Sequence, residues 1–344
     1  MKYGYLGRSG LKVSKLCLGT AAFGVEGLVT KEREYASIGE KEAFRIMDAA
    51  LDAGINFFDT ANVYGGVRLR GETIGHRGAT EEIIGRWFAQ GGNRREKVVL
   101  ATKVGRVFEE DEIDGPNKAQ GLSLYKIRRH FEASLKRLQT DHIELYQMHH
   151  VDRHVLWEEL WEAFEGLVRQ GKVDYIGSSN FAGRDLMKAQ AAAKERHFMG
   201  LISEQHGYNL LNRLPELDVL PTAKELGIGV TIFSPLARGL LALDVMRPIT
   251  RKLTDDAEML LATHRSQMEQ FSCLCRELGE KEAHVSLAWL LAQPAISSPI
   301  IGPSSVEELQ DTLRAVEIEL DASTLKQIDE IFPVPSEVSM FKRT

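Results

Sequence analysis

The regular alternation of strand-like and helix-like stretches is the feature that most restricts how this chain can fold. Short apolar runs predict strands, apolar residues at the helical period predict helices, and the two kinds alternate eight times. Eight such units with buried strands predict a closed parallel (β/α)8 barrel, whose active-site groups lie at the carboxyl ends of the strands. The predicted strands are 15–18, 55–59, 97–102, 143–148, 173–177, 201–204, 229–233 and 299–301. The predicted helices are 40–53, 80–90 with Thr80 as N-cap, 123–138, 155–169, 184–194, 217–226, the helical region 256–278 with 283–291, and 306–316.

Two segments lie outside this repeat. Residues 1–14 predict a β-hairpin with its turn at residues 7–10, and residues 321–344 predict a further helix and a tail that either closes over the pocket or trails in solvent. Three long connections, 25–39, 106–121 and 237–256, are expected to shape substrate access. No shift in composition marks a linker, so residues 1–344 are expected to form a single domain.

Composition places the protein among ordinary cytoplasmic chains. The 344 residues carry a net charge of -6, which argues against a nucleic acid or an anionic membrane as partner. Three cysteines are too few for a disulfide framework and fit a reducing compartment. Because the chain starts without a signal-peptide core and contains no run of about 18 apolar residues, we expect neither export nor membrane insertion.

Residues 57–65 bring a carboxylate and a phenol close together beyond the second predicted strand. That strand runs out of apolar residues at Asp59, and Tyr64 follows. A phenol, whose unperturbed pKa is about 10, is a poor proton donor or acceptor at neutral pH unless a cation lies beside it. Tyr64 therefore needs a lysine partner, and Lys103 at the end of the third strand is the candidate, with Asp59 to hold it. His149 ends the fourth strand.

The order of these residues, Asp and Tyr, then Lys, then His, resembles the catalytic tetrad of the aldo-keto reductase family. The resemblance runs from residues 11–14 to residues 301–305. It implies that Asp59 holds Lys103, that Lys103 lowers the pKa of Tyr64, and that Tyr64 protonates a carbonyl oxygen as a hydride arrives at the carbon. His149 would orient the carbonyl or assist the proton transfer. Each residue alone could be an ordinary polar group at the end of a strand. Four such residues at the ends of three consecutive strands favour a shared site.

The resemblance also implies a nicotinamide cofactor in the barrel mouth, without metal or flavin. Neither GxGxxG after a strand nor GxxxxGK[ST] occurs, so Rossmann and P-loop sites have no support. Ser179 and Asn180 match the residues that hold the carboxamide, Gln205 completes that clamp, and Phe233 would stack on the nicotinamide. Ser234, Leu236, Arg238 and Gly239 would contact the phosphates. The full set of expected cofactor contacts is Gly19, Thr20, Ser179, Asn180, Gln205, Phe233, Ser234, Pro235, Leu236, Arg238, Gly239, Gly302, Ser304, Glu308 and Thr312.

The segment from Gly302 to Thr312 departs from the family pattern. It opens a helix, whose N-terminus favours a phosphate, and Ser304 is the expected adenosine contact. Glu308 stands where many members have Gln or Arg, and Thr312 stands where many have Asn. An acid would repel a ribose 2′-phosphate, so NADPH is expected but NADH is a second candidate. Arg247, Arg251 or Lys252 could restore the NADPH preference.

Three other features have simpler interpretations. His150 follows His149, but neighbouring strand residues point to opposite faces, so we expect a structural role or a loop contact. Cys273 and Cys275 diverge by about 200° on a helix, which favours core packing over a metal. The acidic residues 109–112 are most simply a solvated loop, although they could discriminate against anionic substrates.

The sequence therefore predicts an NAD(P)H-dependent reductase of aldehydes or ketones. Residues 62–65, 80–87 and 146–150 resemble bacterial members associated with sugar and deoxysugar reduction. One alternative is a cofactor-binding regulatory subunit that acts through a protein partner, as the ion-channel β subunits of the family are thought to do. Another is a different (β/α)8 enzyme, such as a metal-dependent hydrolase. The expected partner is a small-molecule carbonyl compound, and the sequence leaves open whether the chain forms a homo-oligomer.

Overall fold

Eight parallel strands close into a barrel at the centre of the molecule. The computed structural model describes residues 1–24, 38–65, 67–69, 72–74, 76–106, 121–249 and 253–335. The closed barrel runs in the order β10, β11, β12, β3, β4, β7, β8, β9, and its neighbouring strands pair in parallel. The predicted (β/α)8 barrel is confirmed. Its strands are β3 (Cys17–Gly19), β4 (Phe57–Asp59), β7 (Val99–Val104), β8 (Ile143–Met148), β9 (Val173–Ser179), β10 (Leu201–Gly207), β11 (Gly229–Phe233) and β12 (Ile296–Ile301).

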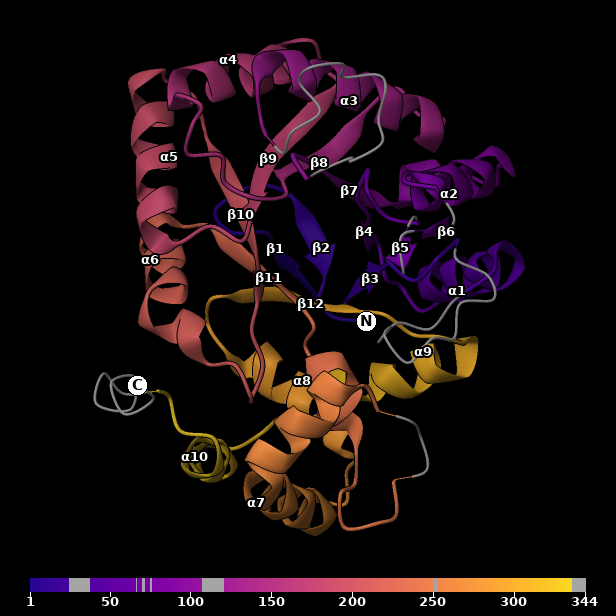
Figure 1. Ribbon diagram of the computed structural model, residues 1–344, viewed down its shortest axis with the longest axis vertical. Helices are drawn as coiled ribbons and strands as arrows, with labels where there is room; N and C mark the ends of the chain where they lie inside the picture. The colour runs from indigo at the N-terminus through magenta and orange to yellow at the C-terminus, as the bar shows by residue number, and fades with distance from the viewer. Residues whose placement is uncertain are drawn as a thin grey trace.

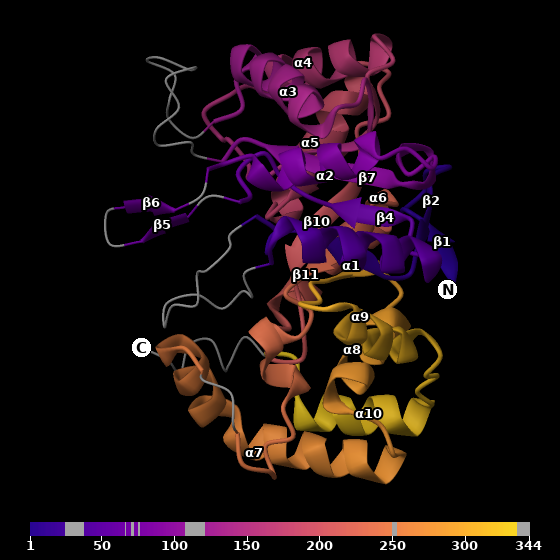
Figure 2. The same cartoon turned by 90° about the vertical axis from the view of Figure 1, so that its right-hand side faces the viewer.

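Helices surround this barrel, as Figure 1 shows. Each α-helix buries apolar residues against the strands or a neighbouring helix, which gives one continuous core between the two layers. In both views α7 and α10 lie farther from the barrel than α8 does (Figures 1 and 2). The helices are α1 (Glu40–Asp52), α2 (Ala79–Ala89), η1 (Arg95–Lys97), α3 (Leu124–Leu138), α4 (Trp157–Arg169), α5 (Gly183–Glu195), η3 (Leu214–Leu217), α6 (Val219–Leu226), η4 (Ala237–Ala242), α7 (Asp255–Leu278), α8 (Glu282–Ala292), α9 (Val306–Thr312), η5 (Leu313–Val316) and α10 (Ala322–Ile331).

The predicted N-terminal hairpin closes the amino end of the barrel. Its strands β1 (Tyr3–Tyr5) and β2 (Lys12–Ser14) pair antiparallel, and Leu6 and Val13 pack against apolar residues inside the barrel. Gly7 lies against Gly229 at the start of β11, so the hairpin lies at the amino end. A second hairpin, β5 (Val67–Leu69) with β6 (Glu72–Ile74), was not predicted and lies on the opposite side of the molecule (Figure 2).

Some predicted boundaries differ from the structure. Thr80 is not the N-cap of α2, because Gly78 takes that position with a φ of 91°, and the Thr80 side chain donates instead to the Phe23 carbonyl at 2.9 Å. The long connection predicted at 237–256 contains the short helix η4. Most of the other two long connections (25–37 and 107–120), the acidic run within the second, and the end of the tail (336–344) lie outside the described residues. Within the described ranges, no helix is both long and apolar enough to cross a bilayer.

The closure of the barrel by the hairpin makes Gly7 a position that only glycine fits. Its φ is +60°, and an added Cβ would lie 2.5 Å from the Gly229 nitrogen. Gly7→Ala should therefore lower the free energy of unfolding by strain of about 1–2 kcal/mol and by overpacking of a further 1–3 kcal/mol or so. Gly91→Ala is the matched control, since Gly91 has a φ of +77° with nothing within 4 Å of an added Cβ. Equal losses in urea denaturation would show that the contact with Gly229 has no role.

Candidate active site

The four residues predicted to act together meet at the carboxyl end of the barrel. Asp59 is the last residue of β4, Lys103 lies in β7, and His149 directly follows β8. Tyr64 lies in the turn after β4, whose path is fixed by bonds from the Tyr64 nitrogen to the Ala61 carbonyl (3.1 Å) and from the Gly78 nitrogen to the Tyr64 carbonyl (2.9 Å). The order of the strands in the barrel therefore brings together Asp59 and His149, which are 90 positions apart in the sequence.

Lys103 is fully buried, and its ammonium group uses three acceptors. Its Nζ donates to Asp59 Oδ2 at 2.6 Å, to the Thr60 carbonyl at 2.9 Å and to the Tyr64 hydroxyl at 3.0 Å. Burial by itself lowers the pKa of Lys103, but the charges and hydrogen bonds of Asp59 and Tyr64 outweigh burial and raise it above its usual value. The raised pKa favours the charged form of Lys103, which lies in contact with the phenol oxygen.

The other carboxylate oxygen of Asp59 is held by two amides. Gln205 Nε2 donates to Oδ1 at 2.7 Å and Gln147 Nε2 donates to it at 3.2 Å. Gln147 is fully buried and was missed by the sequence reasoning, although it pairs in register with Lys103. Gln205 was predicted to contact the cofactor, and here its amide nitrogen contacts Asp59.

His149 is buried beside the phenol. Its ring lies edge-on to the Tyr64 ring, with centroids 6.0 Å apart. Burial first, and then the positive charges of Lys103 and Arg106, lower the pKa of His149 well below its usual value. No described residue hydrogen-bonds its Nδ1. A neutral imidazole can orient a carbonyl without adding a charge.

His150 lies closer to this site than strand alternation suggests. Its ring stacks on that of His149, with centroids 5.2 Å apart and an angle of 3° between the planes. The alternation argument was wrong because β8 ends at Met148, so neither histidine lies in a strand. A hollow of about 460 Å³ lies beside His150 and is also lined by Asp152, Arg153 and His154.

The last residue of β9, Ser179, and the residue after it, Asn180, are held tightly against β10 and His149. Ser179 Oγ and the Asn180 nitrogen both donate to the Gln205 carbonyl, at 2.9 and 3.0 Å. Asn180 Nδ2 donates to the His149 carbonyl at 3.1 Å and to Ser179 Oγ at 3.0 Å. The three residues predicted to form a carboxamide clamp therefore lie together beside the predicted catalytic group.

The segment after β11 has an unusual backbone. Ser234, Ala237 and Arg238 all have positive φ, as does Gly239. Non-glycine residues rarely adopt this conformation, and such strain occurs most often at functional sites. The Phe233 ring lies 2.9 Å from where a Cβ on Gly207 would stand, so this glycine leaves room for the ring. Pro235 is buried and Leu236 is half-buried.

The predicted adenosine segment contains an internal contact that the sequence reasoning did not foresee. The backbone nitrogen and the hydroxyl of Ser304 both donate to Glu308 Oε2, at 2.8 and 2.6 Å. Thr312 Oγ1 donates to the Glu308 carbonyl at 2.8 Å, and Gly302 is exposed. Arg247 pairs with Asp244, while Arg251 and Lys252 lie outside the described residues. The carboxylate of Glu308 thus occupies donors that a phosphate would use.

Gly19 and Thr20 support Asp59 from the neighbouring strand. The Thr20 nitrogen and Oγ1 both donate to the Asp59 carbonyl, at 3.0 and 2.9 Å. Gly19 pairs with Asp59 in register, and a Cβ there would lie 2.7 Å from Ile300 Cγ2. Both residues therefore have a structural role at the base of the site.

The two clustered cysteines do not share one environment. Cys275 is buried, as core packing predicts, but Cys273 is exposed. The prediction of core packing was wrong for Cys273, because residues two apart on a helix face different sides. Within the described ranges, no three His, Cys, Asp or Glu side chains gather as a metal site would require.

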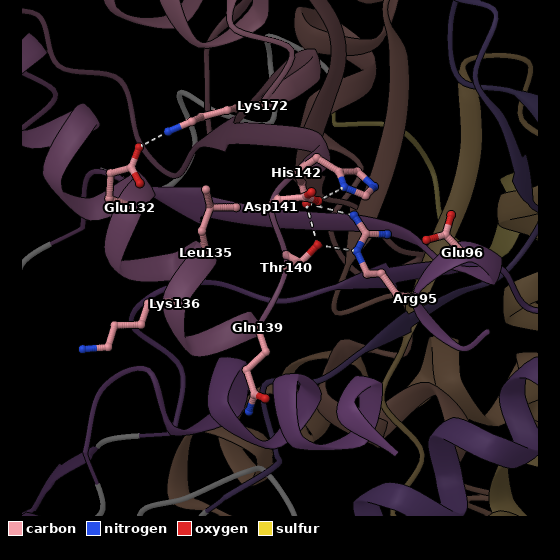
Figure 3. Close-up of a pocket in the computed structure, with 10 residues that line it drawn as sticks. All are labelled: Arg95, Glu96, Glu132, Leu135, Lys136, Gln139, Thr140, Asp141, His142 and Lys172. Atoms are coloured by element: carbon pink, nitrogen blue, oxygen red, sulfur yellow. Dashed lines mark hydrogen bonds and ion pairs between the residues drawn. The ribbon is translucent and has the colours of Figure 1, made fainter. Parts of the chain in front are cut away.

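A larger hollow, of about 790 Å³, lies at the other end of the barrel (Figure 3). His142 and Lys172, which line it, directly precede β8 and β9, so this hollow is at the amino end of the strands. Several of its charged groups are already paired, with Arg95 bound to Glu144 and Lys172 to Glu132. Size alone therefore does not identify the active site here.

Comparison with known proteins assigns the family. The model of the Aldo/keto reductase family matches residues 15–332. The chain is 59% identical over 335 residues to an uncharacterised oxidoreductase, YrpG, of Bacillus subtilis (strain 168), with 97% of each chain covered. It is 31% identical over 355 residues to the aldo-keto reductase AMT2 of Alternaria alternata, covering 95% of this chain and 90% of that one. It is 31% identical over 336 residues to a protein of Arabidopsis thaliana named as a probable voltage-gated potassium channel subunit beta, with 92% of each chain covered.

The chain belongs to the aldo/keto reductase family, a family of oxidoreductases, as the order of the four polar residues predicts. Members of this family in general use a nicotinamide cofactor and act on small carbonyl compounds. The assignment also removes the interpretation as an unrelated barrel hydrolase.

The buried ion pair yields a prediction about stability. Lys103→Met should lower the free energy of unfolding by about 3–5 kcal/mol, because it leaves the Asp59 carboxylate buried without its cation. The double variant Asp59→Asn, Lys103→Met carries neither charge and should regain most of that loss. Urea denaturation of the wild type, both single variants and the double variant measures this. A double variant no more stable than Lys103→Met would contradict the pairing.

The lowered pKa of His149 predicts a dependence of stability on pH. An unfolded histidine titrates near pH 6.5, so as the pH falls the unfolded chain takes up this proton before the folded one does. The stability contributed by neutral His149 is fully present above about pH 6.5 and is lost below it, at up to about 1.4 kcal/mol per pH unit.

His149→Gln should therefore flatten the fall in unfolding free energy between neutral pH and about pH 5. Exposed His154→Gln is the control and should leave that slope unchanged. If both variants kept the wild-type slope, burial of His149 would not be the cause of the fall in unfolding free energy.

Proposed function

We propose that this protein catalyses the reversible, NAD(P)H-dependent reduction of an aldehyde or ketone to an alcohol. The contact of Lys103 Nζ with both Asp59 (2.6 Å) and the Tyr64 hydroxyl (3.0 Å) is the observation that carries this proposal. A fixed cation beside a phenol stabilises the phenolate that remains after proton donation. The family assignment agrees with this chemistry.

Each residue of the site has one role in this proposal. Tyr64 gives its proton to the carbonyl oxygen of the substrate. Lys103 stabilises the phenolate oxygen that remains on Tyr64. Asp59 fixes the position of the Lys103 ammonium group, together with the Thr60 carbonyl. His149, whose pKa is lowered by burial, orients the carbonyl.

The residues at the barrel mouth suit a nicotinamide cofactor, which when bound supplies the hydride. Ser179, Asn180 and Gln205 offer hydroxyl and amide groups to a carboxamide, and Phe233 offers a ring for stacking. The room beside Gly207 and the strained backbone from Ser234 to Gly239 support this fit. We assign the remaining contacts to Gly302, Ser304, Glu308 and Thr312.

The choice between NADPH and NADH depends in this proposal on Glu308. Its carboxylate binds both donors of Ser304, so a ribose 2′-phosphate would meet a negative charge there. NADPH would require Glu308 to turn away, whereas NADH would not. The carbonyl compounds tested as substrates should include sugars and deoxysugars, because three sequence segments resemble family members associated with their reduction.

A regulatory role is the second candidate, supported by the likeness to the Arabidopsis potassium channel subunit. Multiple turnovers on a carbonyl panel favour the enzyme. A stoichiometric protein partner without turnover favours the regulatory subunit.

Substitution of the phenol tests the proposed proton donor. Tyr64→Phe keeps the ring but removes the proton, so turnover should fall by about 10²–10⁴-fold, while cofactor affinity should stay close to that of the wild type. Tyr125→Phe, at an exposed position on α3, is the control and should change neither quantity. Steady-state reduction of the panel and fluorescence titration with the cofactor give both numbers. Unchanged turnover in Tyr64→Phe would exclude this donor.

A further inference from the structure

Glu204 is a fully buried carboxylate that no step proposed above uses. It lies in β10 next to Gln205, whose side chain reaches Asp59 inside the barrel. Successive residues of a strand point to opposite faces, so Glu204 points out of the barrel interior, toward the layer of helices. Its register partner on β9 is Ser178.

This carboxylate binds the residues on both sides of the Ser179–Asn180 pair. Ser178 Oγ donates to Glu204 Oε2, and the Phe181 nitrogen donates to Glu204 Oε1 at 3.0 Å. His206 Nδ1 lies 3.1 Å from the same Oε1. One rigid group therefore spans the turn that presents Ser179 and Asn180.

The turn needs such support because Asn180 has a left-handed backbone, with a φ of 62°. Asparagine tolerates this conformation better than most residues, but it is still unfavourable without compensating bonds. A buried charge is also unfavourable unless hydrogen bonds satisfy it, and simple packing would be met by an apolar residue. Burial raises the pKa of Glu204, while hydrogen bonds from His206, Ser178 and Phe181 oppose that rise.

We propose that Glu204 is a positioning residue, which sets the Ser179–Asn180 pair for the carboxamide of the nicotinamide cofactor. The inference rests on the proposed function, because it assumes that this pair contacts the carboxamide. Glu204 itself touches neither cofactor nor substrate. Its effect is confined to the nicotinamide half of the cofactor.

The test separates the two halves of the cofactor. NADPH and NADH are titrated into wild type and variants, together with 2′-phospho-ADP-ribose and ADP-ribose, which lack the nicotinamide. Glu204→Gln keeps the shape but removes the charge, and Ser178→Ala removes one of the two anchors. Glu165→Gln is the matched control, since Glu165 is a buried carboxylate on α4 paired with Arg169 and Arg196.

Glu204→Gln should weaken binding of the whole cofactor about tenfold, which corresponds to about 1.4 kcal/mol. Both fragments should bind as they do to the wild type, and Ser178→Ala should show a smaller effect of the same kind. Glu165→Gln should change no affinity.

Loss of affinity for fragments and whole cofactor alike would assign Glu204 a general structural role and overturn the proposal. Unchanged affinity for all ligands in both Glu204→Gln and Ser178→Ala would also overturn it. Failure of the wild type to bind NADPH or NADH would instead refute the proposed function.

Discussion

The buried contact between Lys103 and Asp59 is the interaction on which the rest of the site depends. An ammonium group with no solvent exposure is stable only where acceptors surround it, and Asp59, Thr60 and Tyr64 provide them. The carboxylate in turn requires donors, which come from Gln147 and Gln205. Thr20 holds the backbone of Asp59 through two further bonds. One ion pair is therefore surrounded by residues that lie in, or directly after, five strands of the barrel: β3, β4, β7, β8 and β10.

The barrel interior changes from apolar to polar along each of three strands. Residues two apart face the same side of a strand, so the inward positions pass from Phe57 to Asp59, from Ala101 to Lys103 and from Leu145 to Gln147. The apolar layer packs against Leu6 and Val13 of the hairpin that closes the amino end. A packed, closed base holds the polar layer rigidly, which is what a precise contact between Lys103 and Tyr64 requires.

The parts that the sequence predicted are those governed by local pattern. The bounds of β8 and β11 follow the apolar runs, and the barrel follows from the count of strand–helix units. Gln147 was missed because a single polar residue in an apolar strand is ambiguous, although its place two residues after Leu145 marks it as inward-facing. Glu204 and the contact of Ser304 with Glu308 depend on tertiary placement that no local pattern reveals. The stacking of His149 and His150 was missed because strand alternation was applied to two residues that lie beyond Met148, where β8 ends.

The account as a whole rests on a nicotinamide site at the mouth of this barrel. Titration of the intrinsic fluorescence of the purified protein with NADPH and, separately, with NADH tests that claim most directly. The account predicts saturable binding of at least one of them at one molecule per chain, and a preference for NADH would agree with discrimination by Glu308. If neither cofactor bound, the reductase interpretation would be contradicted.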